Sequence, residues 1–179
     1  MKTSSPSATK KFSQAKLAPE TALLPTPAAG ASGKRILLVD DDPGVRESLA
    51  AALRSEGYRV LPTQDGQAAL NVAAKTKVDL VLLDLNMPVK NGWDTFERLT
   101  AQNPLLPIII ITARPNQLFT AAGAGVGALL EKPLDIPRLF QTVNALLAES
   151  GEVRLARITG RQAAFHYLPQ ATQHWGINE

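Results

Sequence analysis

A set of polar residues in this 179-residue chain follows four short apolar runs, at the end of each run. They are three consecutive aspartates, a further aspartate, a threonine and a lysine: Asp40, Asp41, Asp42, Asp84, Thr112 and Lys132. Each apolar run is typical of a buried strand, and the C-terminal ends of parallel strands in an open α/β sheet converge on one crevice. Clustered carboxylates bind Mg²⁺, while a hydroxyl and an ammonium group can hold phosphoryl oxygens. The pattern therefore predicts a site for a divalent metal ion and a phosphoryl group.

Each of these residues taken alone has a simpler interpretation. An aspartate after a strand is most often a turn residue or a helix cap, and a lysine before a proline, such as Lys132, is usually a solvated loop residue. Recurrence at four strand ends favours one common site. In that site Asp40 and Asp41 leave the first strand in adjacent positions and can face a metal ion beside Asp84. Three carboxylates buried together without a cation would repel one another, so a bound cation is expected.

Strands and helices alternate from Arg35 onward, which predicts a doubly wound α/β fold with a five-stranded parallel sheet. The expected strands are 36–39, 58–61, 80–83, 107–111 and 126–130. The runs 36–39 and 80–83 are apolar throughout, as found when helices cover both faces of a sheet. Asp42 is expected to cap the first helix. Three glycines should shorten the fourth helix: Gly123, Gly125 and Gly127.

Two segments flank this domain, which we expect to span residues 34–150. Residues 1–33 are rich in Ser, Pro, Ala and Lys without a hydrophobic period, and this composition predicts a disordered arm. Residues 151–179 are too few for an independent output domain. The apolar residues of 153–158, with interleaved arginines, suggest a marginal strand or a docking segment. We favour a short tail packed on its own domain over a peptide that docks on a partner.

The composition excludes several classes of site. The chain has no cysteine, so it cannot form a disulfide, a thiolate metal centre or a cysteine nucleophile. No apolar run approaches the roughly 18 residues of a membrane span, and we expect a cytoplasmic protein without membrane contact. The basic surplus lies in the two ends of the chain, so the central domain offers no basic surface for nucleic acid and direct DNA binding is not expected.

Residues 35–149 resemble the receiver domain of two-component response regulators. The matching motifs occur in the family's order: Ile36–Pro43, Leu82–Pro88 with Gly92, Ile111–Ala113, and Lys132 with Pro133. This resemblance implies a CheY-like receiver fold, in which five βα units form a flavodoxin-like parallel sheet. It covers about two thirds of the chain.

The resemblance also implies a role for each residue of the site. Asp84 is the phosphoacceptor, and it takes a phosphoryl group from the phosphohistidine of a sensor histidine kinase or a phosphotransfer protein. Thr112 and Lys132 bind the phosphoryl group and report its presence to the fourth and fifth strands. The implied Mg²⁺ ligands are Asp40, Asp41, Asp84 and the backbone carbonyl of Asn86.

A phosphorylated signalling protein has two alternatives. An unphosphorylated receiver-like interaction module would not need the intact acidic set. A Mg²⁺-dependent aspartyl-phosphate phosphatase of the haloacid dehalogenase type needs a general acid two residues after its aspartate, and Asn86 in that position cannot protonate a leaving group. We therefore expect a non-enzymatic protein that signals by contact with a downstream protein. The sequence names neither that target nor the kinase, and it leaves a homodimer open.

One departure from the family pattern lies just before the lysine. The family often carries an aromatic residue three positions before it, where this chain has Leu129. A leucine lacks a hydroxyl that could hold it outside, so we expect Leu129 to be buried whatever the phosphorylation state. The activating change should then lie in the glycine-containing backbone of residues 113–127.

Overall fold

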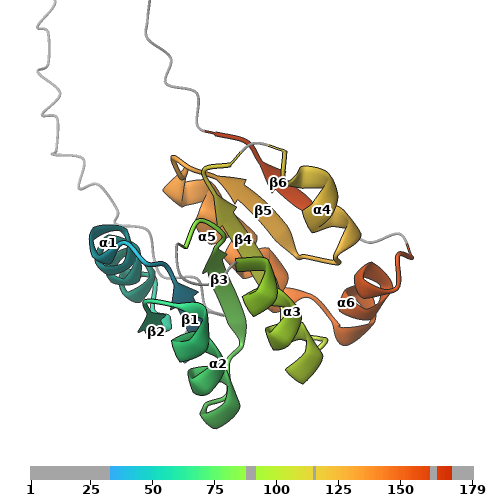
Figure 1. Ribbon diagram of the computed structural model, residues 1–179, viewed down its shortest axis with the longest axis horizontal. Helices are drawn as coiled ribbons and strands as arrows, with labels where there is room; N and C mark the ends of the chain where they lie inside the picture. Colours follow the sequence, from blue (N-terminus) through green and yellow to red (C-terminus); the bar gives the residue numbers. More distant parts are fainter. Residues whose placement is uncertain (1–32, 88–91, 115, 162–164, 171–179) are drawn as a thin grey trace, which may run out of the picture.

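The computed structural model describes residues 33–87, 92–114, 116–161 and 165–170, arranged as Figure 1 shows. Within these residues six parallel strands form one sheet in the order β2-β1-β3-β4-β5-β6. The strands are β1 (Arg35–Val39), β2 (Arg59–Thr63), β3 (Leu80–Asp84), β4 (Ile108–Thr112), β5 (Ala128–Glu131) and β6 (His166–Leu168). The helices are α1 (Pro43–Ser55), α2 (Gly66–Lys75), α3 (Gly92–Gln102), α4 (Leu118–Gly123), α5 (Ile136–Ala148) and α6 (Gly151–Ile158).

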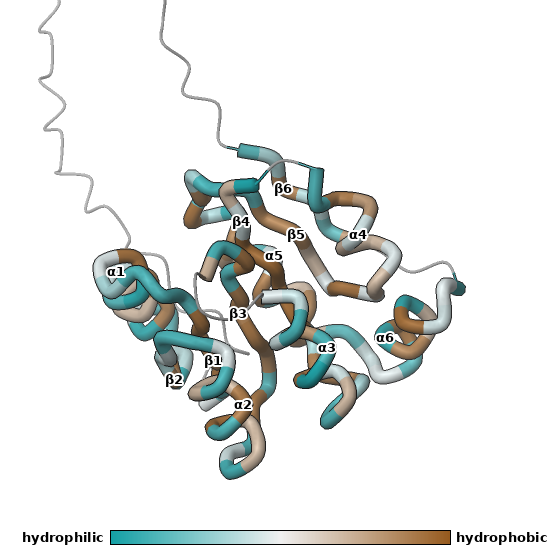
Figure 2. Tube along the Cα trace, viewed as in Figure 1, coloured by the Kyte–Doolittle hydropathy of each residue, from teal (hydrophilic) through white to brown (hydrophobic). Residues whose placement is uncertain are grey.

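Alternate residues of each strand face opposite sides of the sheet, and each side has its own apolar core. On one side, Leu38 of β1 belongs to a cluster with Leu53 of α1 and Val143 of α5. On the other side, Leu83 of β3 belongs to a cluster with Leu99 of α3, together with residues of α2 and α4. Figure 2 shows the central strands as the most apolar part of the chain. The sheet is therefore a buried layer between two layers of helices.

The doubly wound parallel sheet and its first five strands are confirmed, with strand ends shifted by at most two residues. Asp42 caps α1, as predicted, because its Oδ1 accepts hydrogen bonds from the backbone nitrogens of Gly44 at 2.7 Å and Val45 at 3.1 Å. Helix α4 is short, with six residues. Strand β2 contains Pro62, which an edge strand tolerates. The predicted disordered arm lies outside the described residues and stays a prediction.

The segment after residue 150 differs from the expectation in two ways. Residues 153–158 do not form a strand but belong to α6, because Ser150 caps this helix and Arg157 pairs with Glu149 next to α5. Further on, β6 pairs with β5 and adds a sixth strand to the five that the sequence predicted. The described tail thus packs on its own domain, as we favoured.

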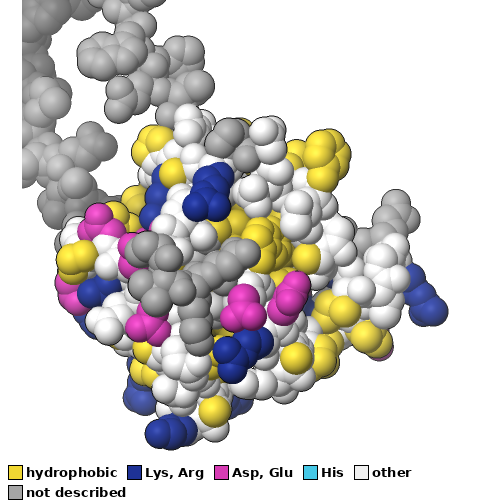
Figure 3. All heavy atoms as spheres, in the orientation of Figure 1, with side chains coloured by type: hydrophobic (Ala, Val, Ile, Leu, Met, Phe, Trp, Pro, Cys, Tyr) yellow, Lys and Arg dark blue, Asp and Glu magenta, His cyan; other side chains and the backbone are white. Residues whose placement is uncertain are grey.

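The length of the helices and the charge of the surface were compared with what a membrane or a nucleic acid would require. Among the described residues, no helix has both the length and the apolar character needed to cross a bilayer. On the face that Figure 3 shows, acidic side chains lie among basic ones, and no extended basic patch is seen there.

Candidate functional site

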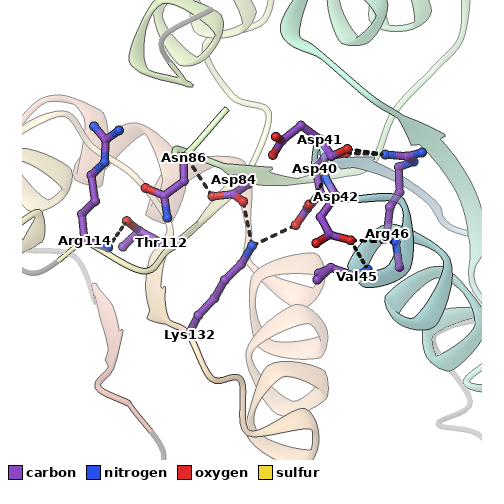
Figure 4. Close-up of polar contacts among 11 residues, drawn as sticks. Asp40, Asp41, Asp42, Val45, Arg46, Asp84, Asn86, Thr112, Arg114 and Lys132 are labelled. Carbon is purple, nitrogen blue, oxygen red and sulfur yellow. Dashed lines mark hydrogen bonds and ion pairs between the residues drawn. The ribbon is translucent and has the colours of Figure 1, made fainter. Parts of the chain in front are cut away.

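The C-terminal ends of β1, β3, β4 and β5 lie next to one another and carry the polar residues that the sequence singled out (Figure 4). Asp40 follows β1, Asp84 ends β3, Thr112 ends β4 and Lys132 follows β5. Successive crossovers leave this edge on opposite sides of the sheet, since β1 lies between β2 and β3, and such a switch point opens a crevice. The structure therefore brings together residues from four strands.

Lys132 joins two of the carboxylates in this crevice. Its Nζ lies 2.6 Å from Oδ2 of Asp84 and 3.0 Å from Oδ2 of Asp40. Asp84 is 3% exposed and Asp40 is 1% exposed, so solvent screens these charges little. Carboxylate oxygens of Asp40, Asp41 and Asp84 all lie within 4.8 Å of one another. In the described part of the site, one ammonium group therefore contacts two of the three clustered carboxylates.

Burial and charge oppose each other in this cluster. Burial raises the pKa of Asp40, although the hydrogen bond and the charge of Lys132 partly offset it, and the charge of Asp84 raises the pKa further. Burial by itself would lower the pKa of Lys132, but the hydrogen bonds and charges of Asp84 and Asp40 together raise it. Lys132 is thus protonated at neutral pH, and the negative charge of the cluster exceeds what it neutralises.

Backbone groups fix the orientation of the acidic side chains. The backbone nitrogen of Asp42 donates to Oδ1 of Asp40 at 2.9 Å, and that of Asn86 donates to Oδ1 of Asp84 at 2.8 Å. Arg46 of α1 donates to the carbonyl oxygen of Asp40 at 2.7 Å and to the next carbonyl oxygen at 3.3 Å. The loop after β1 is therefore held by α1, and each buried carboxylate has partners on both oxygens.

Thr112 and two neighbouring side chains lie on the other side of Asp84 (Figure 4). The Thr112 hydroxyl is fully buried and accepts a hydrogen bond from the backbone nitrogen of Arg114 at 2.9 Å. Oδ1 of Asn86 is buried without a hydrogen-bond partner in the described structure. Arg114, an exposed cation two residues after Thr112, was not among the predicted site residues, and neither was Arg46. The sequence carried a signal for each: Arg114 is a charged residue just after a strand, and Arg46 is a charged residue in the first turn of the helix that follows a strand.

Gly92 lets α3 begin close to the end of β3. A Cβ atom there would lie 2.6 Å from Cα of Leu85 and 2.9 Å from the carbonyl oxygen of Asp84. Both distances are too short for a real side chain, so the glycine of the sequence motif is required by a close backbone approach.

The donor groups fit a hard divalent cation. Carboxylate and carbonyl oxygens are the ligands that Mg²⁺ prefers, and the three clustered carboxylates carry more negative charge than Lys132 neutralises. Asp41 is exposed while Asp40 is buried, so the cluster opens toward solvent. Coordination by Asp40, Asp41, Asp84 and the Asn86 carbonyl stays a prediction.

An apolar groove lies beside the crevice, between α1 and the segment that joins β5 to α5. It has a volume of about 500 Å³. Its lining includes Val45 and Leu49 of α1, Leu134 and Ile136 beyond β5, and Lys132 of the site.

Comparison with known sequences assigns the chain to a protein family. Residues 36–144 match the family model of the response regulator receiver domain. The chain is 38% identical over 117 residues to the transcriptional regulatory protein GlrR of Escherichia coli K12, which covers 64% of this chain and 26% of that protein. It is 41% identical over 115 residues to the response regulator MprA of Mycolicibacterium vanbaalenii, covering 63% of this chain and 50% of that protein. The chain thus spans half or less of these relatives.

Comparison with solved structures agrees with the observed topology. A CheY-like response regulator receiver domain protein from Methanospirillum hungatei JF-1 aligns with a TM-score of 0.61 and 27% identity, over 65% of this chain and 94% of that one. The response regulator TrrA of Thermotoga maritima, solved in complex with Mg²⁺ and BeF, aligns with a TM-score of 0.59 and 30% identity, over 63% of this chain and 98% of that one.

Proposed function

Because the chain belongs to the response regulator receiver family, we propose that Asp84 accepts a phosphoryl group from the phosphohistidine of a histidine kinase or phosphotransfer protein, in a Mg²⁺-dependent reaction. The observation that carries this proposal is the contact of 2.6 Å between Nζ of Lys132 and Oδ2 of Asp84, inside a buried cluster of three carboxylates. The site places its carboxylate nucleophile beside a cation that can accompany the incoming group.

In the transfer, a carboxylate oxygen of Asp84 forms a bond to phosphorus while the bond between phosphorus and the donor's imidazole nitrogen breaks, and that nitrogen keeps the electron pair. Lys132 keeps its proton and can move its hydrogen bond from Asp84 to a phosphoryl oxygen. The Thr112 hydroxyl, which accepts from the Arg114 nitrogen in this structure, has a proton to donate to another phosphoryl oxygen. A Mg²⁺ ion bound by the carboxylates and the Asn86 carbonyl would neutralise charge on the group in transfer.

The apolar groove beside Lys132 supports a protein donor rather than a small molecule alone. A donor helix that buries apolar side chains against Val45 and Ile136 would hold its phosphohistidine over the crevice. We propose that the output is likewise a contact with another protein. The family and the amide side chain of Asn86 do not favour the phosphatase alternative.

Acceptance of phosphate by Asp84 can be tested with a small donor. We expect acetyl phosphate with Mg²⁺ to add one phosphoryl group to the wild-type protein, and Asp84→Asn to remain unlabelled. Intact-mass spectrometry measures both proteins. Equal labelling of the two would contradict the assignment of Asp84.

The role of the groove can be tested by comparing donors. Val45→Asp should slow labelling by a panel of phosphorylated histidine kinases while labelling by acetyl phosphate stays unchanged, because the site itself is not altered. Val153→Asp, the same substitution at an exposed position on α6 outside the groove, is the control. Equal slowing with both kinds of donor would show damage to the site instead of loss of docking.

The metal requirement can be tested by stability. A metal ion that binds the folded state alone stabilises it by about 2.7 kcal/mol at a hundredfold excess over its dissociation constant. We expect millimolar Mg²⁺ to raise the melting temperature of the wild type, and Asp41→Asn to lose this shift. An equal shift in both proteins would place the metal elsewhere.

A further inference from the structure

Both oxygens of one carboxylate on β5 are held by the tail of the chain. Tyr167 of β6 donates its hydroxyl to Oε1 of Glu131 at 2.8 Å, and the backbone nitrogen of Gln170 donates to Oε2 at 3.3 Å. These contacts add to the backbone pairing of β6 with β5, in which Tyr167 is opposite Leu129. Leu129 is fully buried, as expected, and an aromatic ring stands beside it on the neighbouring strand instead of on β5 itself.

Glu131 adjoins the site both along the chain and across the sheet. Glu131 immediately precedes Lys132, whose Nζ holds Asp84 and Asp40. Across the sheet Glu131 is paired with Thr112, and the backbone nitrogen of Lys132 donates to the carbonyl oxygen of Thr112 at 2.8 Å. The tail is therefore attached to the strand position that lies between the two residues proposed to bind a phosphoryl group.

We propose that Glu131 is a positioning residue for Lys132, and that docking of β6 on β5 is coupled to the phosphorylation state of Asp84. The proposal rests on the proposed function of Asp84. In the observed state β6 is docked while Lys132 contacts the carboxylates directly. A phosphoryl group on Asp84 draws Lys132 to a new partner farther from the carboxylate carbon, and turns the Thr112 hydroxyl away from Arg114.

Both changes occur at the neighbours of Glu131. They therefore disturb the position of Glu131, which holds β6 through its hydrogen bond to Tyr167. Phosphorylation is then expected to weaken the docking of β6. Coupling between two sites is reciprocal, so the state with β6 undocked must bind a phosphoryl group at Asp84 more tightly than the docked state by the same factor. The strand is suited to such release because it has three residues and none of them is fully buried.

The coupling can be measured from both ends on the full-length chain. Beryllofluoride with Mg²⁺ is the phosphoryl mimic. Its addition should speed hydrogen exchange of the 166–168 amides in the wild type, by about twofold to tenfold if one or two hydrogen bonds are at stake. Conversely, Tyr167→Phe, which removes the hydroxyl alone, should lower the dissociation constant of the mimic, measured by calorimetry, by a factor that does not exceed this coupling.

Tyr58→Phe is the matched control, because the Tyr58 hydroxyl donates to Oδ1 of Asn144 at 2.7 Å, away from β6. It should leave the affinity of the mimic unchanged. If exchange at 166–168 does not respond to the mimic, or if Tyr167→Phe binds it as the wild type does, the coupling is refuted while the role of Asp84 stands. If the wild type neither binds the mimic nor is labelled by acetyl phosphate, the proposed function fails, and the coupling with it.

Discussion

The crevice and the β6 edge belong to one sheet but are held together in different ways. In the crevice, Asp40 and Asp84 are almost completely buried, and Lys132 contacts both at 3.0 Å or less. At the edge, the side chain of Tyr167 reaches Glu131 through an exposed hydrogen bond. Removing one partner from buried charges is costly, whereas an exposed hydrogen bond contributes little net stability. The comparison indicates a rigid site bordered by an edge that can open.

The largest effect should come from Lys132→Ala. This change leaves two buried carboxylates facing each other without a cation, and we expect it to lower the free energy of unfolding by about 3 kcal/mol without metal. Mg²⁺ should restore part of the loss. Urea denaturation with and without Mg²⁺ measures both effects. Lys34→Ala, which removes a half-exposed pair with Asp79 at 3.9 Å, is the control and should change little. Equal losses in the two variants would mean that the crevice is no more tightly held than the surface.

Helix α6 of the tail should behave like the crevice and not like the β6 edge, because it also carries a buried ion pair. The side chains of Arg157 and Glu149 are 6% and 11% exposed. We expect Arg157→Ala to cost about 2 kcal/mol while labelling of Asp84 stays unchanged. The control is Arg98→Ala, whose pair with Asp94 on α3 is exposed. A loss of labelling in Arg157→Ala would show that the whole tail, and not β6 alone, supports the site.

Gly92 and Gly123 lie in surroundings of very different density. A Cβ atom at Gly92 would meet backbone atoms within 3 Å, whereas one at Gly123 of α4 would meet nothing within 4 Å. We expect Gly92→Ala to destabilise the protein by about 1 to 2 kcal/mol. Gly123→Ala should be neutral or slightly stabilising, since alanine is the better helix former. Thermal denaturation of the two variants checks this; similar melting temperatures would contradict the tight approach of α3 to β3.

The smallest effect concerns the titration of Tyr167. The hydrogen bond to Glu131, with burial and the charge of Glu131 added, raises the pKa of this phenol above its ordinary value of 10. The neutral phenol is therefore favoured in the folded protein, and its contribution is present below pH 10 and is lost as the pH rises through the raised pKa. Absorbance titration in a Tyr58→Phe background should show a high pKa for Tyr167. Glu131→Gln should lower it; no change would mean that β6 is not clamped in solution.

Residues whose roles follow from their own position in a strand were predictable from sequence. Asp84 and Lys132 end apolar runs whose length and β-branched or leucine content indicate buried parallel strands. Such runs fix which residues reach the crevice, and the structure brings them together. The contact between Lys132 and Asp84 follows from the convergence of strand ends, which a pattern of alternating elements already implies.

The tail could not be predicted in the same way. The alternation of Val153 and Leu155 suggested a strand, but the segment is a helix because Ser150 caps it and Arg157 has a buried partner. Capping was visible in the sequence, whereas the ion pair depends on how the tail returns to α5. Strand β6 has three residues, too few for a period-2 pattern, and its bond to Glu131 joins positions 36 residues apart. Such pairings are decided by tertiary packing.

Pro62 limits how copies of this molecule can assemble. The backbone nitrogen of Arg59 donates to the carbonyl oxygen of Lys34 at 2.9 Å, so by strand alternation the nitrogen of Pro62 points away from β1. This nitrogen carries no hydrogen, so the outer side of β2 offers one donor fewer for pairing with another chain. The other edge strand, β6, has three residues and is followed directly by Pro169, which also lacks a backbone hydrogen. Both edges of the described sheet are therefore poor places for a second copy to extend the ladder.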